Sequence, residues 1–525
     1  MSQMLKSSGA LASATLTSRI LGMVREIVYA RFMGDGPVAS AFKLAFQIPN
    51  LFRRLLGEGA LSAAFIPIFK AKEKTEGERE MWRSANAVIS AMVVVAAAVI
   101  ALVMLGISLV LALHDFDANT RLMLLLLRIM FPYMLVICLT AILMGMLNAR
   151  GHFFVPAAGA LILNLVMIAS VLFLAPRMGG NLNQQIFGLA IGVLIAGVAQ
   201  AAFQLPTLRR EGFRYQWVAP WRDETVRQVV LKMIPGALGV AAFQINVLVT
   251  YGIAFWIDPQ IVASFDYAVR LMELPQGVFG ISLATYLLPT LSGLAAEKDY
   301  TAFRATLLQG LGYLIFANLI ASVMLVVLAE PIIRLIFEHG RFDTGSTQRA
   351  AFALACLAPG LVAFSMVNVL ARAFYALGDT QTPMKISVVC LGLNLVFALW
   401  LVLSFHPGYR QGGLGIANTL TAACNVGLLL YALHRKLSRL QLSPLTQTLP
   451  AKLAAATAAG LACWAAGRYW EHSLGHENLP ARLGAVMAPM ALGGSVYWGI
   501  TFYLHVPAAR EIAAALWQRV RPGSG

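Results

Sequence analysis

Charged side chains are scarce in this chain. Only 12% of its 525 residues are Asp, Glu, Lys or Arg, whereas 59% are hydrophobic and the mean hydropathy is +0.73. A soluble domain cannot bury so large a share of apolar side chains, so a soluble globular fold is excluded. Apolar windows of about 20 residues, the length at which a helix crosses a bilayer, recur throughout the chain. The composition therefore predicts an all-α polytopic membrane protein.

Cysteine is also rare, and the motifs of common catalytic sites are missing. The five cysteines are dispersed without a CxxC pair, which argues against a disulfide framework or a metal site. No GxxxxGK[ST], HExxH or GxSxG motif occurs, and the eight histidines are isolated. We therefore expect no enzymatic activity, no catalytic residues, no metal, no cofactor and no use of ATP. Transport would draw on the membrane potential, on a monovalent cation gradient or on consumption of the product.

Fourteen apolar windows are long enough to be membrane-spanning helices. The longest of them is expected to tilt, to bend at Pro275 and Pro289, where proline removes a helix hydrogen bond, or to extend past the membrane surface. The windows are 8–33, 38–70, 84–113, 122–148, 155–176, 185–208, 228–257, 260–296, 305–329, 348–377, 384–405, 411–433, 450–468 and 483–505.

The distribution of Lys and Arg predicts the orientation of these spans. If the N-terminus lies inside, the inner tails and loops hold 23 of the 40 Lys and Arg residues and the outer loops hold 8. This excess is the positive-inside pattern, so both termini are expected in the cytoplasm. The net charge of +16 then reflects topology and contact with anionic membrane lipids, and we expect no nucleic-acid partner.

An internal repeat relates the two halves of the chain. A pattern of Pro, Gly and Pro, typical of a helix–turn–helix, recurs at an offset of 227 residues. It consists of Pro132, Gly151 and Pro156 in the first copy and of Pro359, Gly378 and Pro383 in the second, with a weaker match of Pro49 to Pro275. Six spans separate the copies, so both copies have the same orientation in the membrane.

The repeat predicts two pseudo-symmetric six-helix bundles with two further helices at the C-terminal end. The expected divisions are an N-terminal bundle at 1–224, a C-terminal bundle at 225–440, two additional helices at 441–507 and a cytoplasmic tail at 508–525. Apolar residues recur at helical spacing in this tail, which is typical of a helix lying in the membrane interface.

Several arginines lie deep inside apolar windows, where a charge costs roughly 2.5–3.5 kcal/mol. They are Arg19 and Arg25 in the first window, Arg53 and Arg54 in the second, and Arg270 in a later one. Such residues face a water-filled cavity or a partner, and cations indicate an anionic cargo. Arginine suits pyrophosphate because its planar guanidinium binds phosphate oxygens in pairs and stays charged. We therefore expect a cationic central cavity between the two bundles.

Acidic residues close to these arginines are the expected supporting residues, because ion pairs orient a buried guanidinium and lower its cost. They are Glu26 on the same helix face as Arg19, Glu58 four residues after Arg54, and Asp266 and Glu273 on either side of Arg270. The alternative is that the pairs of Arg54 and Arg270 only hold helices together. Lys43 is a further supporting cation, or else it extends to the lipid headgroups, as Arg31 and Arg128 also could.

Four segments of the chain resemble a known family. They are SRILGMVREIVYARFMG, FQIPNLFRRLLGEGALSAAFIPIF, YAVRLMELPQGVFGISLATYLLPTLS and the loop IFEHGRF at 336–342. They are similar to the bacterial MurJ (MviN) lipid II flippases, which belong to the multidrug/oligosaccharidyl-lipid/polysaccharide exporter superfamily. The resemblance covers essentially the whole length, including the fourteen spans.

The resemblance implies that the chain flips lipid II, the undecaprenyl-pyrophosphate-linked peptidoglycan precursor, from the cytoplasmic to the outer leaflet by alternating access. It implies a place in the bacterial inner membrane and a role in cell wall biogenesis and cell shape. The family's essential cavity arginines match Arg19, Arg25, Arg53 and Arg270. The last two spans would form a groove for the lipid tail. Lipid II, membrane lipids and the peptidoglycan synthesis machinery are the implied partners, and we expect a monomer.

The sequence departs from some relatives, and two other functions stay open. Ser40 and Val269 stand where some relatives have Asp, Gln47 where some have Lys, and Glu26 where Asp is frequent, which puts the role of an Asp beside the outer gate in doubt. A flippase for another polyprenyl-pyrophosphate-linked glycan would use the same chemistry. A multidrug or cation antiporter of the same superfamily would need an acidic cavity, which the deep arginines oppose.

Overall fold

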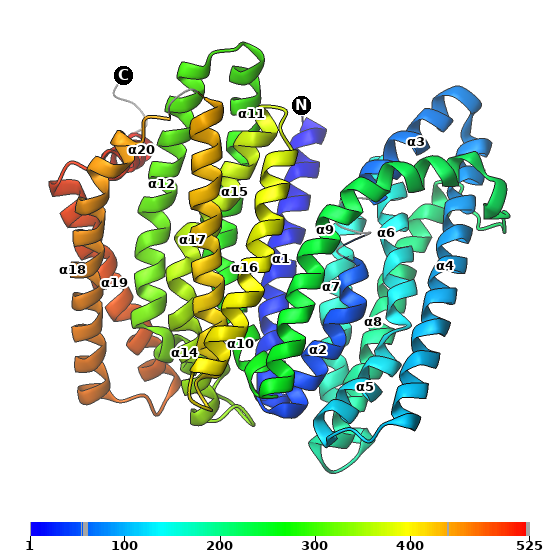
Figure 1. Ribbon diagram of the computed structural model, residues 1–525, viewed down its shortest axis with the longest axis horizontal. Helices are drawn as coiled ribbons and strands as arrows, with labels where there is room; N and C mark the ends of the chain where they lie inside the picture. Colours follow the sequence, from blue (N-terminus) through cyan, green and yellow to red (C-terminus); the bar gives the residue numbers. More distant parts are fainter. Residues whose placement is uncertain (1, 54, 56–60, 438–439, 521–525) are drawn as a thin grey trace. The chain divides into compact units, whose positions relative to one another are not determined.

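The computed structural model describes residues 2–53, 55, 61–437 and 440–520, and every regular element in these ranges is a helix. Contacts divide the chain into two compact units. Unit 1 comprises Met1–Ala263 and His339–Phe342, and unit 2 comprises Ser264–Glu338 and Asp343–Gly525. Within each unit, long helices run alongside one another (Figure 1). The all-α class predicted from the composition is confirmed.

The helices of unit 1 follow one another with short connections. They are α1 (Ser2–Met33), α2 (Pro37–Phe52), α3 (Leu61–Glu76), α4 (Glu78–Leu113), α5 (Ala118–Met130), α6 (Tyr133–Ala149), α7 (Phe154–Ala169), a π turn (Ser170–Leu174), a 3-10 turn (Ala175–Met178), α8 (Leu182–Arg210), a 3-10 turn (Pro220–Arg222) and α9 (Glu224–Ile257).

The helices of unit 2 begin with α10, whose first residues belong to unit 1. They are α10 (Ile261–Pro275), a π turn (Gln276–Ile281), α11 (Ser282–Ala296), α12 (Tyr300–Val327), α13 (Ala329–Phe337), α14 (Thr344–Leu357), a 3-10 turn (Ala358–Gly360), α15 (Leu361–Ala376), α16 (Gln381–Ser404), α17 (Arg410–Lys436), α18 (Ser443–Leu474), α19 (Leu479–Tyr503) and α20 (Pro507–Val520).

Among the described residues, ten helical segments are long and apolar enough to cross a membrane. The pair α5 and α6, bent by 42°, makes an eleventh if it is counted as one span. The polytopic class is thereby supported, while the predicted count of fourteen is not established. The predicted window 38–70 is divided between α2 and α3. Pro49 lies near the end of α2 and lacks a backbone donor, and at Arg53 the chain is already in a π turn.

The Pro and Gly pattern of the repeat forms the same local structure in both copies. Pro132 separates α5 from α6, and Pro359 lies in the 3-10 turn between α14 and α15. The second helix of each pair ends before a glycine with positive φ, +86° at Gly151 and +73° at Gly378. The closing hydrogen bonds run from His152 N to Leu147 O and from Asp379 N to Phe374 O, both 2.9 Å. These are Schellman-type helix ends, so the predicted helix–turn–helix is confirmed twice.

Contacts place α9 in unit 1, together with the helices that precede it. The predicted boundary between the two bundles, after residue 224, was inferred from the repeat. The repeat reflects similarity of sequence, whereas the two units are defined by contacts between residues. The two six-helix bundles and the two additional helices therefore stay a prediction. The expected helix after residue 507 is present as α20.

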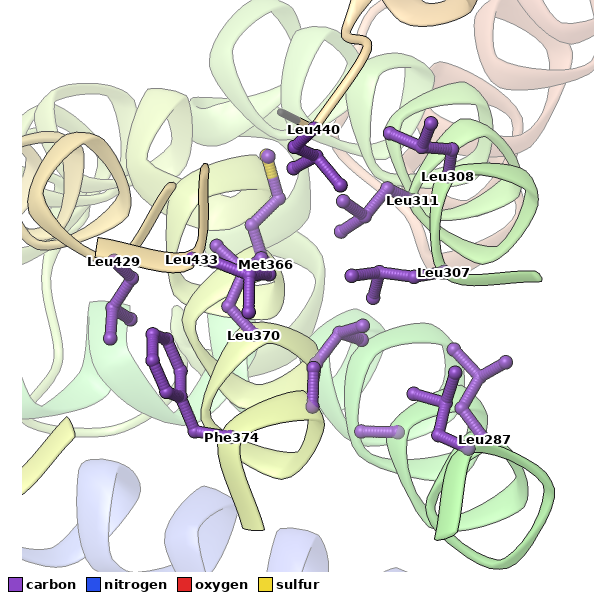
Figure 2. Packing of buried hydrophobic residues seen from close by; sticks show 14 of the residues in the cluster. Leu287, Leu307, Leu308, Leu311, Met366, Leu370, Phe374, Leu429, Leu433 and Leu440 are labelled. Atoms are coloured by element: carbon purple, nitrogen blue, oxygen red, sulfur yellow. The ribbon is translucent and has the colours of Figure 1, made fainter. Parts of the chain in front are cut away.

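The apolar core of unit 2 lies where α11, α12, α15 and α17 meet. Leu307 and Leu311 of α12 point toward Leu370 of α15, while Leu433 of α17 lies beside Met366 (Figure 2). Because lipid tails are as apolar as leucine, these contacts stabilise the unit mainly through close packing. Leu440, in the loop after α17, belongs to the same apolar cluster. The core therefore lies at the end of unit 2 where this loop follows α17.

Close approach of α16 and α17 at Gly413 leads to a first testable prediction. A Cβ at this position would lie 2.8 Å from Leu401 C and from Val402 N, and backbone atoms cannot move aside cheaply. We expect Gly413→Ala to destabilise the protein by about 1–3 kcal/mol, seen as a lower Tm in detergent. Gly427→Ala in the same helix is the matched control, since no atom lies within 4 Å of its added Cβ. Equal Tm values for the two variants would contradict this packing.

Candidate functional site

The predicted deep charges fall on three helices. Arg19, Arg25 and Glu26 lie on α1, and Lys43 lies on α2 with Arg53 directly after it. Asp266, Arg270 and Glu273 lie on α10 within unit 2. Arg54 and Glu58 lie outside the described residues.

The loop His339–Phe342 holds the C-terminal end of α1. Its Arg341 N–H donates to Arg31 O at 3.0 Å, and Arg341 Nη1 donates to Phe32 O at 2.8 Å. These carbonyls belong to the last turn of a helix, where intrahelical donors are missing. Gly34 follows with φ +62°, and a Cβ there would lie 2.7 Å from Arg341 O. Glycine is therefore required at this turn, which sets where the helix with the deep charges ends.

Arg25 is oriented by two oxygen acceptors. Its Nη2 donates to Glu26 Oε1 at 2.6 Å, and its Nη1 donates to Asn164 Oδ1 of α7 at 3.0 Å. The Asn164 amide in turn donates to Ser18 O at 3.3 Å. The guanidinium carbon also lies 5.5 Å from the centre of the Tyr29 ring, within the range of a cation–π interaction. A buried guanidinium held on several sides presents its planar donors in one defined direction.

Lys43 completes a buried ion cluster with Arg25 and Glu26. Its Nζ lies 3.8 Å from Glu26 Oε2, and the Lys43 and Glu26 side chains are only 8% and 6% exposed. One carboxylate therefore lies between two cations of unit 1. Lys43 does not extend outward, so the alternative that it reaches lipid headgroups is wrong. Breaking such a buried pair by removing one partner costs several kcal/mol.

Arg19 and Arg53 differ from Arg25 in their surroundings. The Arg19 side chain is exposed, and no ion pair links it to Glu26 or to any other described residue. Arg19 and Glu26 were expected on one helix face from their seven-residue spacing, but they do not form an ion pair. Arg53 Nε donates to Asn50 Oδ1 at 2.8 Å, and Asn50 is buried. Arg53 lies where α2 passes into a π turn, a distortion that is frequent at functional sites.

The predicted run of charges around Arg270 is confirmed within unit 2. Arg270 Nη1 lies 3.1 Å from Glu273 Oε2, and Nη2 lies 3.8 Å from Asp266 Oδ1. The Glu273 side chain is 48% exposed, so that pair contributes little stability, whereas Asp266 is 15% exposed. The helix continues past Pro275 into the π turn Gln276–Ile281. The repeat-related Pro49 and Pro275 are therefore both followed by π turns.

Ser40 has a structural partner in unit 1. It is fully buried, and its Oγ accepts a hydrogen bond from Ala263 N at 3.0 Å. Ala263 lies in the first turn of α10, where backbone N–H groups have no acceptor within the helix. The serine thus acts as a cap supplied by another helix, a role that its sequence position did not reveal.

Sequence reasoning missed the two asparagines that hold the arginines. Asn164 is separated from Arg25 by 139 residues, and Asn50 lies three residues before Arg53. Asn164 is a polar residue inside the predicted span 155–176, and a lone amide in an apolar window commonly marks a contact between helices. That signal could have identified it, although not its partner.

The family model described as "Lipid II flippase MurJ" matches residues 29–483 of this chain. The chain belongs to the MurJ lipid II flippase family. A MurJ relative from Burkholderia cenocepacia, named "Lipid II flippase MurJ", is 32% identical over 506 residues, covering 93% of this chain and 95% of the relative. A MurJ relative from Vibrio cholerae serotype O1, named "Probable lipid II flippase MurJ", is 34% identical over 447 residues, covering 82% and 83%.

Solved structures show the same fold. "Lipid II flippase MurJ, inward closed conformation" matches with a TM-score of 0.75 at 21% identity, covering 94% of this chain and 98% of that chain. An inward-facing multidrug resistance MATE family transporter of the MOP superfamily matches with a TM-score of 0.64 at 14% identity, covering 82% and 98%. These identities support a common helical architecture. MurJ family membership itself rests on the sequence comparisons, and it agrees with the resemblance found in the motifs.

Proposed function

We propose that this chain flips lipid II from the cytoplasmic to the outer leaflet of the bacterial inner membrane by alternating access. Family membership supports the transported lipid. The observation that carries the mechanism is the buried cluster of Arg25, Glu26 and Lys43, which places two cations inside unit 1. Charges at this depth are costly, so they are typical of a path for a charged substrate.

In the proposed mechanism, Arg25 receives the pyrophosphate group of lipid II. Arg25 Nη2 donates a hydrogen bond to the Glu26 carboxylate. A phosphate oxygen is also an anionic acceptor, so it can accept the same hydrogen bond in place of Glu26. In the proposed mechanism Glu26 holds the guanidinium oriented until pyrophosphate replaces it. Asn164 keeps Nη1 in place during this exchange. Arg19, Arg53 and Arg270 are the further proposed contacts of a cationic central cavity.

Substrate binding would drive the conformational change by differential affinity. Cations that repel one another favour a state in which they stay apart, and a bound dianion favours a state in which they approach it. The proposed energy source is the membrane potential or a monovalent cation gradient, without ATP. The proposed arrangement is a monomer with both termini in the cytoplasm, in contact with lipid II, membrane lipids and the peptidoglycan synthesis machinery.

Growth of a flippase-depleted bacterial strain tests the assignment of Arg19 and Arg270. We expect Arg19→Ala and Arg270→Ala to fail to support growth at normal membrane levels, because each removes a charge-assisted contact to the pyrophosphate. Arg83→Ala is the control, since Arg83 is exposed at the start of α4 and pairs only weakly with Glu80. Wild-type growth of both variants would remove these residues from the mechanism.

The transported lipid needs a separate measurement. Depletion of this protein should lower the amount of lipid II accessible from the outer leaflet, and the wild-type chain should restore it. If outer-leaflet lipid II stays constant while another polyprenyl-pyrophosphate-linked glycan disappears from that leaflet, the chain carries the other lipid.

A further inference from the structure

A hollow of about 500 Å³ lies at the end of unit 1 where α4 begins. In Figure 1 this end of α4 lies beside α3. Three segments line it. Arg79 and Trp82 come from the first turns of α4, Arg150 from the end of α6, and Arg210 and Gly212 from the end of α8. The hollow contains none of the deep charges on α1 and α2, and three of its lining residues are arginines.

The acidic residues of the hollow are paired with Arg150. Arg150 lies 2.8 Å from a Glu211 oxygen and 3.1 Å from a Glu78 oxygen, and these are the two lining carboxylates. It also lies 2.5 Å from Glu73 of α3, and His152 lies 2.9 Å from Glu211. The hydrogen bonds from His152 and Arg150 hold the pKa of Glu211 below its usual value, so this carboxylate stays ionised and paired. The network ties together the ends of α3, α6 and α8.

Arg79 and Arg210 take no part in this network of ion pairs. Both side chains are exposed and line the hollow, and neither forms an ion pair with a residue in the described ranges. Two guanidinium groups facing one hollow repel each other unless an anion lies between them. Each offers a planar pair of donors suited to phosphate oxygens.

Trp82 supplies a third donor without an acceptor. The residue is 9% exposed, and its ring packs between Phe69 and Phe213, each at 5.5 Å between ring centres. Its indole Nε1 is buried and has no hydrogen-bond partner among the described residues. The nitrogen faces Gly212, since a Cβ there would lie 3.6 Å from it. Buried polar groups are nearly always paired, so an unpaired donor in the wall of a cationic hollow points to a missing acceptor.

Exposed aromatic residues lie on a loop that contacts α4 close to the hollow. The loop after α8 runs along α4, where Asn86 Nδ2 donates to Arg214 O at 3.0 Å and Ser90 bonds Tyr215 at 3.2 Å. Its exposed aromatic residues are Tyr215, Trp217 and Trp221. Such residues concentrate at the membrane–water boundary. Trp82 precedes Ser90 by eight residues, about 12 Å along the helix toward the aqueous side.

We propose that this hollow is a second anion site, distinct from the buried cluster on α1 and α2, that binds a phosphate group. Arg79 and Arg210 hold the phosphate oxygens from either side, and the Trp82 N–H donates to one of them. The phosphate belongs either to the headgroup of an anionic membrane lipid or to a soluble phosphate or pyrophosphate compound. Both sources offer the same oxygens at this depth.

Fluorine NMR on the full-length protein labelled with 5-fluorotryptophan tests the proposal. The Trp82 signal is assigned by its absence in Trp82→Phe, and the protein is placed in nanodiscs of zwitterionic phosphatidylcholine. One arm titrates inorganic pyrophosphate. The other arm replaces part of the lipid with phosphatidylglycerol and adds no soluble phosphate. We expect the Trp82 signal to shift in a saturable manner in at least one arm, and the responding arm identifies the source.

Variants decide whether the shift reports the proposed site. Arg79→Ala/Arg210→Ala should weaken binding by about tenfold or more, because it removes both charge-assisted contacts. Arg83→Ala, on the same helix turn but outside the lining, should bind as wild type, and so should Arg25→Ala, which alters only the proposed transport site. The proposal is overturned if the Trp82 signal shifts in neither arm, or if the double variant binds as tightly as wild type.

Discussion

Replacing Arg25 by Ala is expected to reduce lipid II flipping by at least about 100-fold. Arg25 is oriented by Glu26 on Nη2 and by Asn164 on Nη1. A hydrogen bond to a charged group contributes roughly 1.5–3 kcal/mol, and two such bonds to pyrophosphate account for a loss of this size. The measurement is the initial rate of lipid II translocation in proteoliposomes containing equal amounts of folded protein.

The conservative variant separates a binding role from a structural one. Arg25→Lys keeps the positive charge next to Glu26 but loses the planar fork that contacts Asn164 and Glu26 together. We expect Arg25→Lys to fold as wild type and to flip lipid II at an intermediate rate. If Arg25→Ala were folded and flipped lipid II at the wild-type rate, Arg25 would have no part in substrate binding.

A large effect on stability is expected at Arg334 of α13. This arginine is 7% exposed, and its guanidinium binds Glu330 of the same helix and Glu471 of α18, the latter at 3.0 Å. It also lies 3.9 Å from Glu338, which is 3.3 Å from Arg482 of α19. Arg334→Ala leaves three carboxylates close together without the cation that joins them. We expect a loss of about 3 kcal/mol in the free energy of unfolding, measured as denaturant stability in detergent.

Two comparisons give this prediction its control. Arg83→Ala removes an arginine whose side chain is 62% exposed, and it should change stability by less than about 1 kcal/mol. Arg334→Met preserves the apolar stem of the side chain but not its charge, so it should be nearly as destabilising as Arg334→Ala. If the Met variant were as stable as wild type, packing and not the ion network would explain the effect.

Local sequence patterns predicted much of the helical framework, because they depend on neighbours along the chain. The Pro and Gly positions of the repeat predicted the helix ends at Gly151 and Gly378 and the helices that follow them. The spacing of Asp266, Arg270 and Glu273 predicted their contacts, since residues three and four apart on a helix meet. These features need no knowledge of which helices are adjacent.

Contacts between helices could not be predicted in the same way. Seven-residue spacing favoured a pair of Arg19 with Glu26, yet Glu26 pairs with Arg25 and with Lys43 of the next helix. Similarly, no spacing along the chain indicated that Arg334 of α13 pairs with Glu471 of α18. In both cases one partner of the ion pair lies on a different helix, Lys43 for Glu26 and Glu471 for Arg334. The spacing of residues along the chain does not indicate which helices pack together.

We propose that cations within the membrane spans bind the pyrophosphate of lipid II. The most direct test needs no substitution in the protein. It compares the equilibrium affinity of the wild-type protein for lipid II with its affinity for an analogue in which a neutral linker of similar length replaces the pyrophosphate. We expect the analogue to bind at least about 100-fold more weakly, because two or more charge-assisted contacts are lost. Equal affinity for both molecules would contradict it.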